Sequence, residues 1–396
     1  MSCKNNKIQN KTSLLKIVVW VAVIISLTFA YIYGLVRKDP LVWEYLQSIF
    51  PEKAEFQTKG INPLLLEIHD QETREFLGYC AAEKSQGWGG PLLVAVFIDS
   101  RGTLERIAVL DHKETPSFFL KLQRHNFFDQ FSGKRVSEPF FLGEDIDTIT
   151  QATVTSKAIT DAVRAASHEV GRNIFDLEIQ REQKRWKFGI NELILLLLFA
   201  GVLVNTKLKS KILRNVVMLM AFIFLGFYLN SAIAIGNLSQ ILLGFIPSFK
   251  ENLFWWILIG GALLMPIVLK KNLYCSYLCP FGTLQDYTSK LSGINIVMRK
   301  KYERLAKNIA FFLTWFALFV IFVTSNPSLG TYEPFATFFR LEGEGIQWFV
   351  LPAVVLGSFI LTRFFCRFFC PVGVVLNLLA KSRYSLGKIL KRQKND

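Results

Sequence analysis

Six stretches of this sequence are apolar over enough consecutive residues to cross a lipid bilayer. A membrane core of about 30 Å takes about 20 apolar residues, because a helix rises about 1.5 Å per residue. Hydrophobic residues make up 51% of the chain, and phenylalanine occurs 36 times, which is more than is usual for a soluble domain. The predicted spans are residues 17–36, 189–204, 215–235, 253–269, 308–325 and 347–365. The sequence therefore predicts an integral membrane protein with six transmembrane α-helices.

The first apolar stretch is interpreted as an uncleaved anchor. It follows Lys4, Lys7, Lys11 and Lys16, and it is longer than the apolar core of a signal peptide, which runs to about 15 residues at most. We find no small-x-small cleavage site after it. Residues 1–37 are therefore predicted to form a cytoplasmic N-terminus and a transmembrane anchor.

The basic residues orient the predicted spans. Cytoplasmic loops carry an excess of Lys and Arg, and such residues gather in the loops that six spans would place on one side. They are Lys207, Lys209, Lys211, Arg214, Lys270, Lys271, Arg299, Lys300, Lys301 and those of the tail from Lys381 to Lys394. The short loops on the other side carry only Lys250 and Arg340 as basic residues. Both termini are therefore predicted to be cytoplasmic, and the net charge of +15 needs no nucleic-acid partner.

Residues 38–187 differ from the rest in having mixed charge, alternating strand patterns and turn residues. These features predict a soluble α+β domain, which the orientation of the spans makes extracytoplasmic. A five-helix membrane module is predicted at 188–380, and a basic cytoplasmic tail at 381–396. The protein is thus expected in the cytoplasmic membrane as a multi-pass chain.

A threonine-rich string at 147–156 precedes a predicted helix in the extracytoplasmic domain. Small and apolar residues at helical spacing follow it, including Ala158, Ile159 and Ala162. In a purely structural interpretation, Thr155 or Ser156 caps this helix. In a functional interpretation, the helix N-terminus binds a phosphate, because its first N–H groups are unpaired and the helix dipole is positive there.

The string resembles the flavinylation motif of the FMN-binding domains shared by NqrC, RnfG and NosR. In that family a threonine forms a phosphoester bond with the FMN phosphate, and by position this residue is Thr153. The glycine-rich segment 87–92, the hairpin 98–102 and the loop His112-Lys113-Glu114-Thr115-Pro116 extend the resemblance over residues 79–167. The resemblance implies covalent FMN on Thr153 and further cofactor-binding residues, which are Asp147, Thr150, Ala152, Thr155, Ser156, His112, Glu114 and Thr115.

Two residues depart from the family pattern. Gln151 and Ser117 stand where glycines are usual, and glycine permits a positive φ and a close approach of the backbone to phosphate. Noncovalent FMN or an empty domain therefore remain alternatives. His112 also has an alternative role, because a lone histidine in a loop is more often a surface or hydrogen-bonding residue than a flavin contact.

Four of the six cysteines form two matching pairs, each written Cys-x-x-x-Cys-Pro with a glycine two residues beyond the proline. The pairs are Cys275 with Cys279 and Cys366 with Cys370. The spacing places both thiols of a pair on one helix face, and the proline ends or kinks the span. Four thiolates at the cytoplasmic membrane edge are a sufficient ligand set for an iron–sulfur cluster or a tetrahedral zinc. The alternative is that they are small buried apolar residues.

The membrane half resembles the module of NosR and NapH-type proteins. With an FMN-binding domain in front and no polyferredoxin tail behind, the layout resembles the PceC/RdhC family of organohalide respiration. That resemblance implies an electron-transfer component rather than a stand-alone catalyst, which relays electrons from the menaquinone/quinol pool to an exported reductive dehalogenase or its membrane anchor. It also implies a flavin transferase for maturation. The alternatives are a NosR-like regulator or maturation factor that senses redox state, and a structural anchor.

The histidines bear on how electrons would cross the membrane. All four, His69, His112, His125 and His168, fall within 38–187, so no bis-histidine haem is expected in the spans. An outer flavin and inner cysteines would be separated by a core of about 30 Å. Either another cofactor lies between them, or only the outer flavin takes part in turnover.

Overall fold

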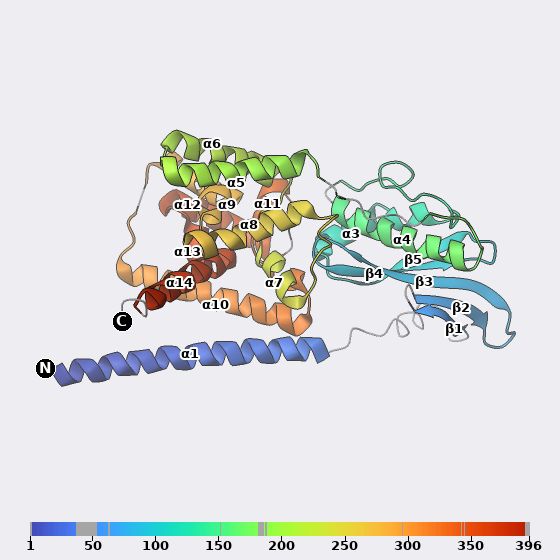
Figure 1. Cartoon of the computed structure of the whole chain (residues 1–396), viewed down its shortest axis with the longest axis horizontal. Coiled ribbons are helices and arrows are strands. Elements are labelled where there is room, and N and C mark those ends of the chain that lie inside the picture. Colours follow the sequence, from blue (N-terminus) through green and yellow to red (C-terminus); the bar gives the residue numbers. More distant parts are fainter. Residues whose placement is uncertain are drawn as a thin grey trace. The chain divides into compact units, whose positions relative to one another are not determined.

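The computed structural model describes residues 2–36, 54–61, 64–150, 152–180, 186, 188–294, 296–341, 343 and 345–392. The chain forms two compact units, of which one comprises Arg37–Lys184 with Gly244–Pro247. The other comprises Met1–Val36, Arg185–Leu243 and Ser248–Asp396. Figure 1 labels the elements of both units.

The first unit is built on a five-stranded antiparallel sheet in which each strand pairs with the next in sequence. The strands are β1 (Ala54–Ile61), β2 (Leu64–Asp70), β3 (Phe76–Gln86), β4 (Pro91–Ile98) and β5 (Leu104–His112). The predicted hairpin at 98–102 joins β4 to β5. There the Asp99 carboxylate accepts from the N–H groups of Arg101 and Thr103, both at 2.8 Å, and Gly102 adopts a φ of +80°.

One face of the sheet packs against helix α4 (Thr153–Asn173) (Figure 1). Side chains of β4 alternate between the two faces, as strand geometry requires: Val94 and Val96 join the core beneath α4, whereas Ala95 joins a separate cluster on the opposite face. Helix α3 (Pro116–Arg124) and the 3-10 helix η1 (Phe127–Phe131) complete the unit. The predicted sheet-containing domain is therefore confirmed.

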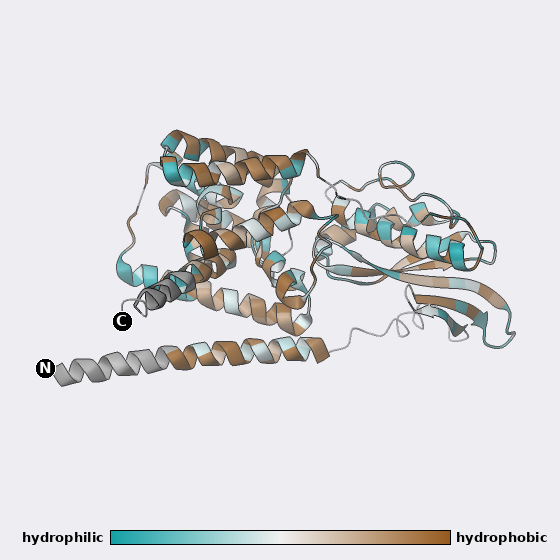
Figure 2. Ribbon diagram, viewed as in Figure 1, coloured by the Kyte–Doolittle hydropathy of each residue, from teal (hydrophilic) through white to brown (hydrophobic). Residues whose placement is uncertain are grey.

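The second unit is helical and strongly apolar (Figure 2). Four of its described helical stretches are long and apolar enough to span a membrane, and they are Ile17–Val36 of α1, α5 (Ile190–Leu208), α6 with η2 (Lys211–Tyr228) and α10 (Lys300–Thr324). The other two predicted spans correspond to shorter apolar helices, α8 (Leu253–Leu269) and α12 (Ile346–Ile360). The chain is thus a membrane protein, and the count of six spans stays a prediction.

Four predicted spans differ from the observed helices at their ends. The span 189–204 continues to Leu208 in α5, and the span 308–325 begins earlier, at Lys300, in α10. The predicted span 215–235 begins earlier, at Lys211, because the Ser210 hydroxyl caps the helix by accepting from the Leu213 N–H at 3.3 Å. It ends with the π-helical η2 (Phe222–Tyr228). The predicted span 347–365 ends at Ile360, because Leu361 is extended and Arg363 has a φ of 55°.

Shorter elements connect and follow these helices. They are α7 (Ile235–Leu243), η3 (Tyr274–Leu278), α9 (Pro280–Ser292), η4 (Pro327–Gly330), α11 (Phe335–Arg340), α13 (Phe364–Phe368) and α14 (Pro371–Arg392). The connections fold back into the unit: the Glu333 carboxylate accepts from the Ile235 N–H at 2.7 Å, and the Tyr274 hydroxyl accepts from the Ile233 N–H at 3.0 Å. Buried backbone N–H groups outside helices are paired in this way.

Candidate functional site

The residue predicted to carry FMN opens helix α4. Thr153 is the first residue of the helix and its side chain is exposed, whereas Ala152 before it is buried. The first N–H groups of a helix lack helical partners, and a phosphate can accept from them. An exposed hydroxyl in this position is open both to FMN and to an enzyme that would attach it.

Inside the first unit, Glu114 connects three predicted motif segments: its own loop after β5, the glycine-rich segment and the start of α4. Its side chain is 1% exposed. It accepts from the Thr155 hydroxyl at 2.7 Å and from the Gly89 N–H at 3.1 Å. Burial raises the pKa of this carboxyl above its ordinary value, and hydrogen bonds from Thr155 and from the backbone of Gly89 and Trp88 only partly offset that effect.

Gly87 shows why the segment beside Glu114 is rich in glycine. A Cβ at Gly87 would lie 2.0 Å from a carboxylate oxygen of Glu114, so only a residue without a side chain lets the backbone approach this closely. The loop after β5, the glycine segment and the first turn of α4 therefore meet at one buried carboxylate.

Two other predicted flavin contacts, His112 and Thr115, lie close to Glu114 in the sequence, and each has a different interaction partner. His112 ends β5 and stacks on Phe119, with ring centroids 3.9 Å apart, and burial lowers the pKa of its imidazole. Thr115 precedes α3, with Pro116 in the first helical position. Thr115 accepts through its carbonyl oxygen from the N–H of Phe118 at 3.1 Å.

The threonine-rich string itself is mostly exposed. Asp147 and Thr150 are exposed, and the Asp147 N–H donates to the Gln130 side chain at 2.6 Å. Gln151 lies outside the described residues. The capping interpretation is wrong, because Ala152 is the N-cap and Thr155 donates to Glu114 instead. Ser156 is fully buried, and its hydroxyl has no partner among the described residues.

The two cysteine motifs fold alike in the second unit. In each repeat an apolar helix (α8 or α12) leads to a short helical turn (η3 or α13), and a proline then starts the next helix (α9 or α14). The second cysteine of each motif donates its N–H to the carbonyl five residues earlier, at 2.9 Å for Cys279 and 3.0 Å for Cys370. This is the hydrogen bond of a π-turn, and it places the proline outside the preceding turn.

The glycine of each motif has the same role in both repeats. The Gly282 N–H donates to the Cys279 sulfur at 3.4 Å, and the Gly373 N–H donates to the Cys370 sulfur at 3.3 Å. Both donors belong to the first turn of a helix that begins at the proline. Donors at a helix N-terminus favour negative charge, so each second cysteine is held as a thiolate ligand would be.

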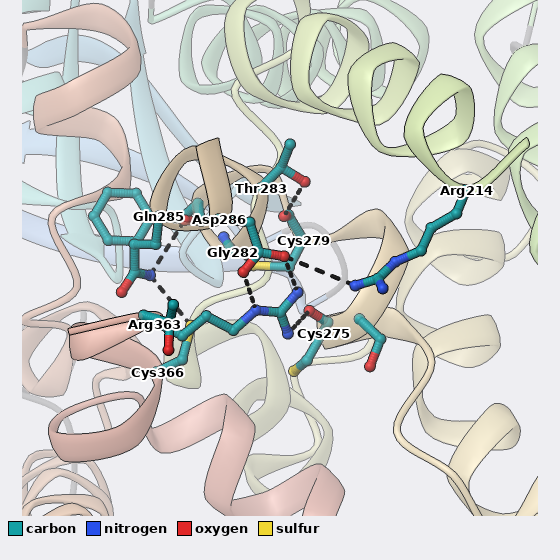
Figure 3. Close-up of polar contacts among 12 residues, drawn as sticks. Arg214, Cys275, Cys279, Gly282, Thr283, Gln285, Asp286, Arg363 and Cys366 are labelled. Carbon is teal, nitrogen blue, oxygen red and sulfur yellow. Dashed lines mark hydrogen bonds and ion pairs between the residues drawn. The ribbon is translucent and has the colours of Figure 1, made fainter. Parts of the chain in front are cut away.

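All four cysteines line one cavity of about 220 Å³. The cavity is also lined by Ile233, Asn272, Tyr274, Ser276, Phe335, Arg363, Arg367, Val372, Gly373 and Asn377. Figure 3 shows Cys275, Cys279 and Cys366 converging with Arg363 from different elements. Phe335 comes from the loop predicted to lie on the opposite side of the membrane, so this loop reaches into the bundle as far as the cysteines.

The four thiols around the cavity bear on the two predicted metal centres. Tetrahedral zinc with Zn–S bonds of about 2.3 Å brings four sulfurs within about 4 Å of one another. No three of the described His, Cys, Asp and Glu side chains lie close enough to share one ion. Four cysteines around one cavity also form the ligand set of an iron–sulfur cluster with four thiolate ligands, and Cys275, Cys279, Cys366 and Cys370 would be these ligands.

Three residues around the cavity were not predicted as site residues. Arg363 makes a two-point ion pair with Asp286 at 2.7 and 2.6 Å (Figure 3). Gln285 donates to the Cys366 sulfur at 3.2 Å and accepts from the Phe365 N–H at 2.8 Å. Aligning the two repeats would not have identified them, because Asn272, Leu376 and Asn377 stand at the matching positions.

Comparisons with known proteins assign a domain to each unit. Residues 87–168 match the FMN-binding domain family, and residues 251–302 and 348–393 match the 4Fe-4S binding domain family. The second match includes both cysteine motifs. The chain therefore combines an FMN-binding domain with a 4Fe-4S binding domain in a membrane protein.

Three relatives illustrate the similarity. The regulatory protein NosR of Pseudomonas aeruginosa is 26% identical over 51% of this chain and 31% of its own length. Protein NirI of Paracoccus denitrificans is 27% identical over 40% of this chain and 25% of its own length. One component of the proton-translocating ferredoxin:NAD(+) oxidoreductase complex of Clostridium ljungdahlii is 27% identical over 25% of this chain and 57% of its own length. The chain thus spans about a third or less of the NosR and NirI relatives.

Proposed function

We propose that this chain is a membrane-bound FMN flavoprotein that relays electrons from the quinol pool to an exported respiratory reductase. The observation that carries the proposal is the pairing, in one membrane protein, of an FMN-binding domain with a cavity lined by four cysteines. FMN supports both one-electron and two-electron steps, and an iron–sulfur cluster supports one-electron steps. A chain with both suits the exchange of electrons between a two-electron carrier and a one-electron carrier.

The flavin is proposed to be covalent and attached to Thr153 by a flavin transferase. The exposed hydroxyl at the N-terminus of α4 supports this. Asp147, Thr150, Ala152, Thr155 and Ser156 belong to the same motif, and His112, Glu114 and Thr115 to the loop beside it. Glu114 fixes that loop against the first turn of α4 through Thr155.

The proposed topology has six spans, cytoplasmic termini and an extracytoplasmic FMN domain. The basic loops support the orientation. Because this topology leaves a core of about 30 Å between the outer flavin and the inner cysteines, either another cofactor lies between them or only the outer flavin takes part in turnover. No haem is proposed in the spans.

The exported acceptor is proposed to be a reductive dehalogenase or its membrane anchor. The layout of FMN-binding domain followed by paired cysteine motifs supports this assignment. Menaquinol is the proposed donor. The regulatory name of the NosR relatives favours a second function, a membrane regulator or maturation factor that senses redox state.

The proposal is tested by co-expressing the full chain with a flavin transferase, beside Thr153→Ala and the control Thr148→Ala, an exposed threonine of the same string without a proposed flavin contact. Intact mass and in-gel fluorescence should show one added FMN in the wild type and in Thr148→Ala, and none in Thr153→Ala. Membranes containing the flavinylated chain are then mixed with a reduced menaquinone analogue under anaerobic conditions. Bleaching of the flavin absorbance supports the relay. A flavin that stays oxidised would refute the proposed electron relay and favour the regulatory function.

A further inference from the structure

The two cysteine repeats contain equivalent positions on either side of each motif. Arg363 lies three residues before Cys366, and Asn272 lies three residues before Cys275. On the other side, Asp286 lies six residues after Pro280, and Asn377 lies six residues after Pro371. The first two positions precede the cysteine turns, and the second two lie in helices α9 and α14.

These four positions form two pairs, and each pair joins one repeat to the other. Arg363 of the second repeat contacts Asp286 of the first, with Nε to Oδ1 at 2.7 Å and an Nη atom to Oδ2 at 2.6 Å. Asn272 of the first repeat donates to Asn377 of the second at 3.3 Å. In each pair, the position before the cysteine turn of one repeat contacts the helix position of the other repeat. A pseudo-twofold axis through the cavity would relate the two pairs in this way.

The charged pair contacts a cysteine of the first repeat, and the residue beside it in α9 contacts a cysteine of the second. Arg363 donates through its other Nη atom to the carbonyl of Cys275 at 3.0 Å. Gln285, next to Asp286 in α9, donates to the Cys366 sulfur at 3.2 Å. The neutral pair has one such contact, from the Cys275 N–H to the Asn272 side chain at 3.2 Å. The charged pair joins the repeats through two hydrogen bonds of 2.7 and 2.6 Å and the neutral pair through one of 3.3 Å, so the charged pair is the stronger connection.

The backbone of Arg363 adopts a conformation that an arginine does not favour, so contacts of its side chain must stabilise it. It has a φ of 55°, in the left-handed region that residues other than glycine rarely adopt. Its side chain lines the cavity, and both partners of the pair are mostly buried, at 23% exposed for Arg363 and 18% for Asp286. A two-point guanidinium–carboxylate pair combines strength with fixed geometry, which is what keeps such a backbone conformation populated.

We infer that Arg363 and Asp286 are positioning residues that lock the two repeats in register, so that four thiols from two separate turns face one cavity. This inference rests on the proposed iron–sulfur role of the cavity and deepens it. The pair does not ligate metal. It sets the places of Cys275 and Cys366, the two ligands that lie in the turns rather than at a helix start.

The test uses the full chain in detergent with Asp286→Asn and Arg363→Gln, the conservative variant Asp286→Glu, and the control Asp161→Asn. The control breaks an ion pair with Arg164 in the other unit. Iron and sulfide per chain should fall about tenfold in Asp286→Asn and Arg363→Gln, as for other residues that orient metal ligands. Asp286→Glu should recover most of the loss, and the control should match the wild type. Wild-type iron content and an unchanged electron paramagnetic resonance spectrum in both disruptive variants would overturn the inference.

A second measurement needs no metal and separates failure of the inference from failure of the proposed cluster. A chain that keeps only Cys275 and Cys366 is treated with a short bis-maleimide, and the cross-linked peptide is quantified by mass spectrometry. Asp286→Asn should lower its yield and Asp286→Glu should not. If the wild type holds no iron but shows this dependence, the cluster is refuted and the positioning role stands. If cross-linking is insensitive to Asp286, the positioning role is refuted.

Discussion

The Thr155 hydroxyl donates a 2.7 Å hydrogen bond to the carboxylate of Glu114, across 41 residues of sequence. The Gly89 N–H donates to the same carboxylate. Three segments that resemble separate family motifs are thereby joined at a single buried group. Because the first turn of α4 also contains Thr153, this group fixes the proposed attachment site against the rest of the domain.

Replacing Glu114 with alanine should loosen the proposed flavin site. The change leaves the Thr155 hydroxyl and the Gly89 N–H without their acceptor, at a cost of about 1 to 3 kcal/mol for each buried unpaired group. Hydrogen–deuterium exchange of the full chain should show faster exchange in peptides covering residues 86–92 and 153–160. Glu114→Gln keeps one acceptor oxygen and should show a smaller change. Equal exchange in all three proteins would contradict the role given to Glu114.

The pH dependence of domain stability should change when Glu114 is replaced. Burial raises the native pKa of this carboxyl above 4.5, so the native state binds the proton more tightly than the unfolded chain. Its stabilising contribution is then complete below 4.5 and is lost as pH rises through the native pKa. In thermal unfolding of the domain between pH 4.5 and 8, Glu114→Gln should therefore lose less stability than the wild type as pH rises.

His112 should change the pH dependence of domain stability in the opposite direction. Burial lowers its pKa below 6.5, so its contribution is present above 6.5 and is lost as pH falls through the native pKa. His112→Gln should remove part of the stability loss on acidification and leave the alkaline range unchanged. The same thermal series measures this effect. A variant that follows the wild type throughout the acid range would show that His112 has the same pKa in the native and unfolded chains.

The two motif glycines should respond differently to alanine, although they occupy equivalent positions. A Cβ at Gly282 would lie 3.2 Å from the carbonyl oxygen of Cys275, closer than ordinary contact, whereas a Cβ at Gly373 would lie no nearer than 3.5 Å to the Cys370 sulfur. Gly282→Ala should therefore shift the Cys275 carbonyl by a few tenths of an ångström, and it should lower iron content several-fold, in line with other changes around metal ligands. Gly373→Ala serves as the matched control and should stay near the wild type.

The sequence predicts the cysteine turns of the cavity but not the contacts that hold them together. The regular offsets of cysteine, proline and glycine predict two equal turns, and the structure brings all four cysteines to one cavity. The pairing of Arg363 with Asp286 depends on how α9 packs against the second repeat, and no local pattern encodes that packing. Likewise, the end of α12 at Ile360 depends on the left-handed backbone of Arg363, which the apolar run up to residue 365 does not reveal.

Gly34 should be essential to the packing of α1 against α10. A Cβ at this position would lie 2.0 Å from the Phe322 carbonyl oxygen, and small residues let membrane helices approach closely. Gly34→Ala must separate the helices and should cost about 1 to 3 kcal/mol, as overpacking does. Thermal unfolding in detergent measures the loss. Gly260→Ala in α8 is the control, because the space around Gly260 is open, and an equal effect of both variants would refute the packing argument.

Reporter fusions should distinguish six spans from four. Helices α8 and α12 have only 17 and 15 residues, and each contains a proline, Pro266 or Pro352. A helix of 17 residues is at the lower limit for a span, at about 25 Å. With six spans, a reporter active only outside the cytoplasm should be active after residues 246 and 343 and inactive after residues 209 and 293. If α8 and α12 do not cross, the reporters after 246 and 293 should report the same side, as should reporters after 343 and in the tail. Cys275 and Cys279 would then lie outside the cytoplasm with residue 293, and Cys366 and Cys370 inside it with the tail, whereas the structure brings all four cysteines to one cavity.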